Sequence, residues 1–229
     1  MIALTCSYKH PTRSQRIAGY LLHNTGSSDG AAALAYYQKN DHGVTPHFVI
    51  DKSGDAYSLV PINKVAYHLK VSSAQAKAYA ERWPKEAPEW WVKRWPKLGS
   101  PLELFTGSSP NGRSIGIELV GSGGNCSDEQ YDRLSELLLK LAADGGPRLS
   151  KRTVIGHSDV NPLGRSDRHG PTDPGRNFDW DRLYQMLRLP NDDEDLRNDG
   201  ALIPLAVDGA PIAHLDNSEV RQVPEDVDV

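Results

Sequence analysis

The sequence has few cysteines and no excess of positive charge. Cys6 and Cys126 are its only two cysteines, so at most one disulfide can form and a secreted disulfide framework is excluded. The formal net charge of -4 argues against a protein that mainly neutralises nucleic-acid phosphates, because that work takes clustered Lys and Arg. We therefore expect no nucleic-acid partner.

Long apolar runs are also missing. No stretch of about 18 apolar residues occurs, so we expect no stable membrane insertion. Residues 1–16 carry His, Lys and Arg where a secretory signal would have its apolar stretch. These features predict synthesis into the cytoplasm, and they indicate nothing about the oligomeric state.

What is present suits one folded domain with a tail. The chain has 229 residues, of which 38% are hydrophobic and 24% charged, enough for a core of ordinary size. We expect a catalytic domain over residues 1–190. The composition of residues 191–229 predicts an acidic linker, and the pair Asp208-Gly209 marks a candidate small β-hairpin within it.

Strand-like and helix-like segments alternate along the domain. Residues 17–24 are almost unbroken apolar, as expected for a strand covered on both faces. Ser127 and Gln130 form a capping box at the start of a helix. The expected strands cover residues 17–24, 47–51, 56–60, 114–120 and 152–157, and the expected helices 30–40, 127–141 and 180–187. This order predicts an α/β (α+β) fold, a central mixed β-sheet flanked by helices.

Residues 73–112 differ in character from the rest. They hold four tryptophans, several prolines and little periodicity, which indicates an insertion. Three interpretations stay open: a flap whose tryptophans pack, a carbohydrate-binding wall, or an amphipathic membrane segment, which the prolines disfavour.

Two of the expected strands end in a histidine, His23 and His157, and Asp173 follows the second by sixteen positions. Two imidazoles and one carboxylate leave the fourth position on Zn²⁺ open for water. Judged by spacing alone, ordinary polar groups at strand ends explain these residues better than a metal site does.

Neighbouring motifs strengthen the metal interpretation. The strings GHSD (156–159), TDPG (172–175) and FDW (178–180) follow LHNT (22–25), AYH (66–68) and SIGIE (114–118) in order. Together they resemble the signature of zinc amidases with the peptidoglycan-recognition-protein fold, which include the AmpD-type muropeptide amidases. The resemblance spans roughly residues 17–187. It implies hydrolysis of the amide bond between N-acetylmuramic acid and L-alanine in peptidoglycan or muropeptides.

The resemblance also implies residue roles. Glu118 would be the general base that takes a proton from the attacking water. Its alternation with apolar neighbours puts it on the pleat face opposite to them. His68 and Asn24 would lie in the substrate site, and Asn24 would also support the first ligand. The implied zinc ligands are His23, His157 and Asp173.

One departure from the family pattern concerns charge stabilisation. AmpD-type enzymes have a lysine two positions before the aspartate ligand, where this chain has Pro171. Its role in stabilising the tetrahedral intermediate would pass to Arg165, Arg168 or His169, with zinc carrying more of the charge. The same loop offers Asp167 as an alternative third ligand, although the TDPG and FDW context favours Asp173.

A second departure concerns a tyrosine that phage lysozyme-type members place before the hairpin strand. Pro46 stands there in this chain, so base duty would fall to Glu118, and His47 is expected to be structural.

Two biological versions of such an enzyme remain open. The insertion and tail favour a lytic enzyme, phage endolysin-like or an effector, delivered to the periplasm or cell wall by a holin or secretion system. The alternative is a cytosolic amidase that recycles anhydro-muropeptides. A non-catalytic peptidoglycan-binding receptor is a further alternative, whereas a zinc metallopeptidase would need an H-E-x-x-H motif that the chain lacks.

Overall fold

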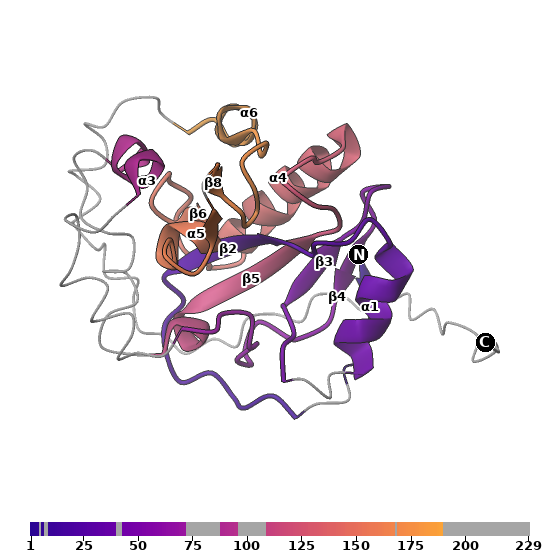
Figure 1. Ribbon diagram of the computed structural model, residues 1–229. Coiled ribbons are helices and arrows are strands. Elements are labelled where there is room, and N and C mark those ends of the chain that lie inside the picture. Colours follow the sequence, from indigo (N-terminus) through magenta and orange to yellow (C-terminus); the bar gives the residue numbers. More distant parts are fainter. Residues whose placement is uncertain are drawn as a thin grey trace.

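The computed structural model describes residues 1–4, 6, 9–39, 43–71, 88–95, 109–167 and 169–189. The predicted tail over residues 191–229 and most of the insertion over 73–112 therefore lie outside the described residues. The described part holds one six-stranded sheet in the order β1-β4-β3-β5-β2-β6 (Figure 1). Its strands are β1 (Ile2–Ala3), β2 (Gly19–Asn24), β3 (Phe48–Ile50), β4 (Ala56–Ser58), β5 (Ser114–Leu119) and β6 (Val154–Gly156).

The sheet is mixed, as predicted. Strand β2 lies between β5 and β6 and runs parallel to both, and β3 runs parallel to β5. Strands β3 and β4 form the expected antiparallel hairpin, and β1 pairs with β4 in parallel. Because β2, β5 and β6 are parallel, their carboxyl ends meet at one edge of the sheet.

One face of the sheet carries the main apolar core. Helices α4 (Asp128–Ala143) and α6 (Trp180–Met186) pack on it. Tyr20, Leu22 and Ile117 of the sheet belong to one buried apolar cluster with Leu134 and Leu138 of α4. Helix α4 begins with the predicted capping box, in which Ser127 accepts from the Gln130 N–H and the Gln130 side chain accepts from the Ser127 N–H.

The opposite face is divided between two smaller apolar clusters. Helix α1 (Gly30–Lys39) covers one end, where Tyr37 packs with Val49 of β3. Helices α3 (Glu89–Arg94) and α5 (His157–Val160) cover the other end, where their apolar side chains cluster with Leu21 of β2. Figure 1 shows α1 and α5 on the side of the sheet away from α4. The polar residues of the site lie on this face.

Several elements differ from the sequence-based expectation. Strand β6 ends at Gly156 because its N–H donates to the carboxylate of Asp159, which starts α5 at His157. The polar loop after His157 also contains a two-stranded sheet, β7 (Ser166–Asp167) with β8 (Gly170–Pro171). The short elements β1, α3 and the 3₁₀ helix η2 (Pro110–Arg113) were not expected.

Two tryptophans of the insertion belong to the core. Trp91 and Trp95 are buried, and their indole N–H groups donate to the backbone oxygen and the carboxylate of Asp159. Asp159 also pairs with Arg94, whose guanidinium stacks on Trp180. This part of the insertion therefore packs beneath α5. No helix in the described ranges has the length and apolar character to span a membrane.

Candidate active site

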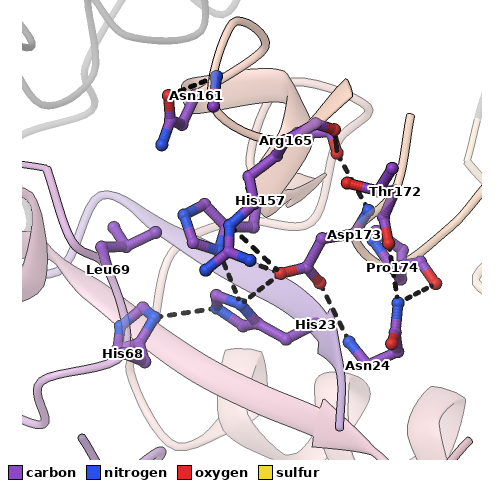
Figure 2. A network of polar contacts seen from close by, with 12 residues as sticks. His23, Asn24, His68, Leu69, His157, Asn161, Arg165, Thr172, Asp173 and Pro174 are labelled. Carbon is purple, nitrogen blue, oxygen red and sulfur yellow. Dashed lines mark hydrogen bonds and ion pairs between the residues drawn. The ribbon is translucent and has the colours of Figure 1, made fainter. Parts of the chain in front are cut away.

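Three side chains converge at the carboxyl ends of β2 and β6. His157 Nδ1 lies 3.1 Å from His23 Nδ1 and 3.0 Å from Asp173 Oδ2, and His23 Nδ1 lies 3.5 Å from the same oxygen (Figure 2). All three residues are buried. The sequence separates them by up to 150 positions, and the parallel pairing of β2 with β6 brings the two histidines together.

The separations fit a metal site. Ligand atoms about 2.0–2.1 Å from a tetrahedral ion stand roughly 3.3 Å apart, so the three donor atoms are spaced as such an ion requires. One donor atom from each residue lies within 4.8 Å of the others. Two neutral imidazoles and a carboxylate are donors that divalent transition metals accept. The residues present therefore fit a bound divalent metal.

Charge within this group is uneven. Burial lowers the pKa of His157 to about 4, although its hydrogen bond to Asp173 opposes the shift. Burial is the largest single influence on His23 and acts to lower its pKa, but the charge and hydrogen bond of Asp173 together with the charge of Glu118 raise that pKa overall. Burial would raise the pKa of Asp173, yet the two histidines hold it below its usual range. The carboxylate is therefore ionised and available to a cation.

The backbone around Asp173 is fixed by two neighbours. Its Oδ1 accepts from the N–H of Asn24, and its own N–H donates to Ser158 Oγ. The Asn24 side-chain amide donates to the carbonyl oxygens of Thr172 and Pro174 (Figure 2). Asn24 thus braces the loop that carries Asp173, whereas the sequence led us to expect support of the first ligand, His23. Its substrate-binding role stays a prediction.

Asp167, the alternative third ligand, lies elsewhere. It is exposed on β7, where its carboxylate accepts from the N–H of His169. The group of possible metal donors among the described residues contains Asp173 and not Asp167.

Glu118 lies beside the three ligand side chains. It pairs in register with His23 on the neighbouring strand, and its side chain points away from the core face, as its alternation with apolar residues predicts. Burial raises its pKa to about 7, and its residue is only 6% exposed. Its Oε2 atom has no hydrogen-bond partner among the described residues. One carboxylate oxygen of Glu118 is therefore available to accept a hydrogen bond or a proton from a bound molecule.

Of the proposed cations that the structure describes, Arg165 lies beside the ligand group. Its Nε lies 3.9 Å from Asp173 Oδ2, and Figure 2 shows its side chain reaching over His157 toward Asp173. The Arg165 carbonyl oxygen accepts from Ser158 Oγ and the Thr172 N–H, which fixes the loop that carries it. His169 is exposed, and its N–H donates to the carboxylate of Asp167. Arg168 lies outside the described residues.

Two further histidines lie on this face. His68 Nδ1 is 2.9 Å from His23 Nε2, and burial lowers the pKa of His68 well below 6.5. His47 is fully buried, accepts from the Gly116 N–H and contacts Arg13, which agrees with its expected structural role. His68 is also buried, with 5% of its surface exposed, so little of it is open to a substrate.

Comparison with known proteins decides the family. The sequence profile of the N-acetylmuramoyl-L-alanine amidase family matches residues 13–176. The chain belongs to this family. The matched stretch contains every site residue from His23 to Asp173, so the predicted family is confirmed.

Two curated relatives of the amidase chain are both named 1,6-anhydro-N-acetylmuramyl-L-alanine amidase AmpD. The Haemophilus influenzae protein is 27% identical over 146 residues, which cover 63% of this chain and 59% of that protein. The Enterobacter cloacae protein is 28% identical over 171 residues, covering 74% of this chain and 71% of that one. The chain thus spans less than two thirds of the first relative.

The fold of the chain also resembles that of AmpD. A crystal structure of a selenomethionine derivative of AmpD aligns with a TM-score of 0.54 at 19% identity, covering 81% of this chain and 93% of that one. The predicted mixed sheet with flanking helices is therefore confirmed as the fold of the amidase.

Sequence reasoning missed one residue of the site. The hydroxyl of Tyr37 on helix α1 makes a hydrogen bond with the Glu118 side chain. Burial, together with the charge of Glu118, raises the pKa of Tyr37, so it remains a neutral donor. Tyr37 follows His23 by fourteen positions and carries no motif, and the packing of α1 on the sheet brings it to the site.

Proposed function

We propose that this chain hydrolyses the amide bond between N-acetylmuramic acid and the first L-alanine of the stem peptide. The observation that carries the proposal is the convergence of His23 Nδ1, His157 Nδ1 and Asp173 Oδ2 within 3.5 Å, in a chain of the amidase family. Peptidoglycan or a muropeptide is then the substrate.

Zn²⁺ is the ion that we propose for the site. Catalytic zinc sites use three protein ligands of this kind and keep a fourth position open. When bound, zinc supplies Lewis-acid polarisation of a carbonyl and lowers the pKa of water to about 7. The ligands would be His23, His157 and Asp173, with the Asn24 N–H and Ser158 Oγ holding Asp173 in place.

Glu118 acts in this proposal as the general base. Its carboxylate takes a proton from the attacking water and then delivers it to the leaving nitrogen of L-alanine. The partner-free Oε2 and the position of Glu118 beside His23 support this role. Tyr37 donates to the same carboxylate and fixes its orientation.

Arg165 acts as the cation that stabilises the negative charge on the former carbonyl oxygen. Its guanidinium approaches Asp173 to 3.9 Å, whereas the position of the family lysine is occupied by Pro171. A preorganised cation in such a place is usually worth a large share of the rate.

Two substrate forms are compatible with this chemistry. The sequence favours polymeric wall, with delivery by a holin or secretion system. The names of both curated relatives favour the soluble 1,6-anhydro-muropeptides as a second candidate. Measuring rates on purified sacculi and on soluble anhydro-muropeptides under the same conditions decides between the two.

The metal-dependent reaction is tested by removing and restoring the ion. Dialysis against a chelator should abolish release of stem peptides from sacculi, and one equivalent of Zn²⁺ should restore it, as read by mass spectrometry. His157→Ala should lose both the bound zinc and the activity. Full hydrolysis by the chelated protein would contradict the mechanism, and binding of sacculi without any hydrolysis would favour the receptor alternative.

A further inference from the structure

His68 is held against strand β5 by the packing of its ring and by hydrogen bonds of its backbone. A Cβ on Gly116 would lie 2.4 Å from the His68 ring, so the ring packs where only glycine leaves room. The N–H groups of His68 and Leu69 both donate to Asn111 Oδ1, whose amide donates back to the Leu69 carbonyl. Hydrogen bonds therefore fix the backbone of His68, and packing against Gly116 fixes the face of its ring.

Both ring nitrogens of His68 have partners. Nδ1 lies 2.9 Å from His23 Nε2, and Nε2 lies 3.0 Å from Ser114 Oγ. The Ser114 hydroxyl donates in turn to the carbonyl oxygen of Pro110 at 2.7 Å. These contacts form a continuous chain from the Pro110 carbonyl to His23, which we call the His68 relay (Pro110, Ser114, His68 and His23).

The direction of each hydrogen bond follows from its far end. A carbonyl oxygen can only accept, so the Ser114 hydroxyl donates its proton to Pro110. The Ser114 oxygen then accepts from His68 Nε2–H. Neutral imidazole carries one ring proton, so His68 Nδ1 must accept, and the donor is His23 Nε2–H. In the neutral form that a metal ligand requires, His23 Nδ1 then keeps its lone pair for the position between His157 and Asp173.

We propose that His68 and Ser114 are positioning residues that hold His23 with its proton on Nε2 and so present Nδ1 to the metal. The inference rests on the proposed function, because it concerns the ion proposed there. The other tautomer would aim an N–H at the cation and remove a ligand. His157 has no such support in the described residues, since its Nε2 is buried without a hydrogen-bond partner.

The first test compares two substitutions of His68 by zinc affinity, measured by competition with a chromophoric chelator. In His68→Asn the Oδ1 atom replaces Nδ1 as the acceptor, whereas His68→Leu has none. We expect H68L to weaken zinc binding about 10–100-fold, whereas H68N should keep most of the wild-type zinc affinity. Equal affinity of H68L and the wild type would overturn the inference.

The second test addresses the far end of the relay with a matched control. Ser114 and Ser135 are both buried serines whose hydroxyl donates to a nearby backbone carbonyl, but Ser135 lies on α4, outside the relay. Ser114→Ala should lower zinc affinity and Ser135→Ala should leave it unchanged. Equal effects of the two substitutions would count against the relay.

The tautomer itself can be read by NMR if H68L fails to fold. Long-range ¹H–¹⁵N spectra of the zinc-loaded wild type should show the His23 proton on Nε2 and a neutral His68 that also carries its proton on Nε2. A His23 proton on Nδ1 would overturn the inference while leaving zinc binding established. A wild type with no zinc affinity would instead refute the proposed function and the relay together.

Discussion

Replacing Arg165 by methionine should slow the reaction without removing the metal. The substitution keeps the aliphatic stem and deletes the charge that we propose to stabilise the former carbonyl oxygen. The bonds that hold the loop use the Arg165 backbone carbonyl, so they survive the change. The effect should therefore appear in kcat rather than in folding.

The size of the loss follows from the geometry. Arg165 Nε is 3.9 Å from Asp173 Oδ2. For an oxyanion formed beside the ligands we assume a separation of about 5 Å from the Arg165 charge. At an effective dielectric constant of about 20, that separation corresponds to about 3 kcal/mol. The Arg165 side chain is 40% exposed, and solvent screening lowers the figure to about 2 kcal/mol, or about 30-fold in kcat.

The assay compares kcat and zinc content for three variants. Arg165→Lys keeps the charge and should lose less than Arg165→Met. Arg133→Met is the matched control, because Arg133 has a similar side-chain exposure of 44% and lies on α4, on the other face of the sheet. A kcat of R165M equal to that of the wild type, with zinc content unchanged, would refute the reasoning.

Three further predictions follow from buried groups. Glu118→Gln should lower kcat about 10²–10⁴-fold at unchanged zinc content, measured by stem-peptide release. Burial and the nearby Arg13 lower the pKa of His47 from 6.5 to about 3, so below pH 6.5 the unfolded chain binds a proton that the folded chain does not. Stability should therefore fall by about 2 kcal/mol between pH 7.5 and pH 5 on this account, and urea unfolding should show that His47→Gln removes this part of the loss. Asp159→Asn removes the buried carboxylate that pairs with the half-buried Arg94, which keeps its hydrogen bond to Tyr184, and should cost about 3 kcal/mol in the free energy of unfolding, measured in urea at pH 7.5.

Each of these three has a result that contradicts it. Activity of E118Q near the wild-type level would remove Glu118 as the base. Identical pH dependence of unfolding for H47Q and the wild type would show that His47 titrates normally in the folded chain. A D159N protein as stable as the wild type would mean that the contacts of Arg94 with Tyr184 and Trp180 suffice without the carboxylate.

Much of the site could be read from the sequence because its residues stand at strand ends. A buried strand that turns polar at a histidine near its carboxyl end, as at His23, puts that side chain near the edge of a sheet. Alternation with apolar neighbours likewise predicted the face on which Glu118 lies, and the structure agrees. These features depend on local pattern, which the sequence displays directly.

The remaining features depend on contacts between distant segments. Three cations in one loop were equally compatible with the charge-stabilising role, and the approach of Arg165 follows from the bonds that Ser158 and Thr172 make to its carbonyl. Tyr37 reaches the site only through the packing of α1. Helix α3 was missed because six residues give too little periodicity, and its burial comes from tryptophan contacts with Asp159.

The central claim is that water attacks the carbonyl carbon of the amide that joins N-acetylmuramic acid to L-alanine. Hydrolysis of a defined muropeptide in H₂¹⁸O, followed by mass spectrometry of both products, tests it most directly. The account predicts one ¹⁸O in the lactyl carboxylate of the sugar product and none in the released peptide, which carries a free L-alanine amino group. Label in the peptide or at a sugar anomeric carbon would contradict it.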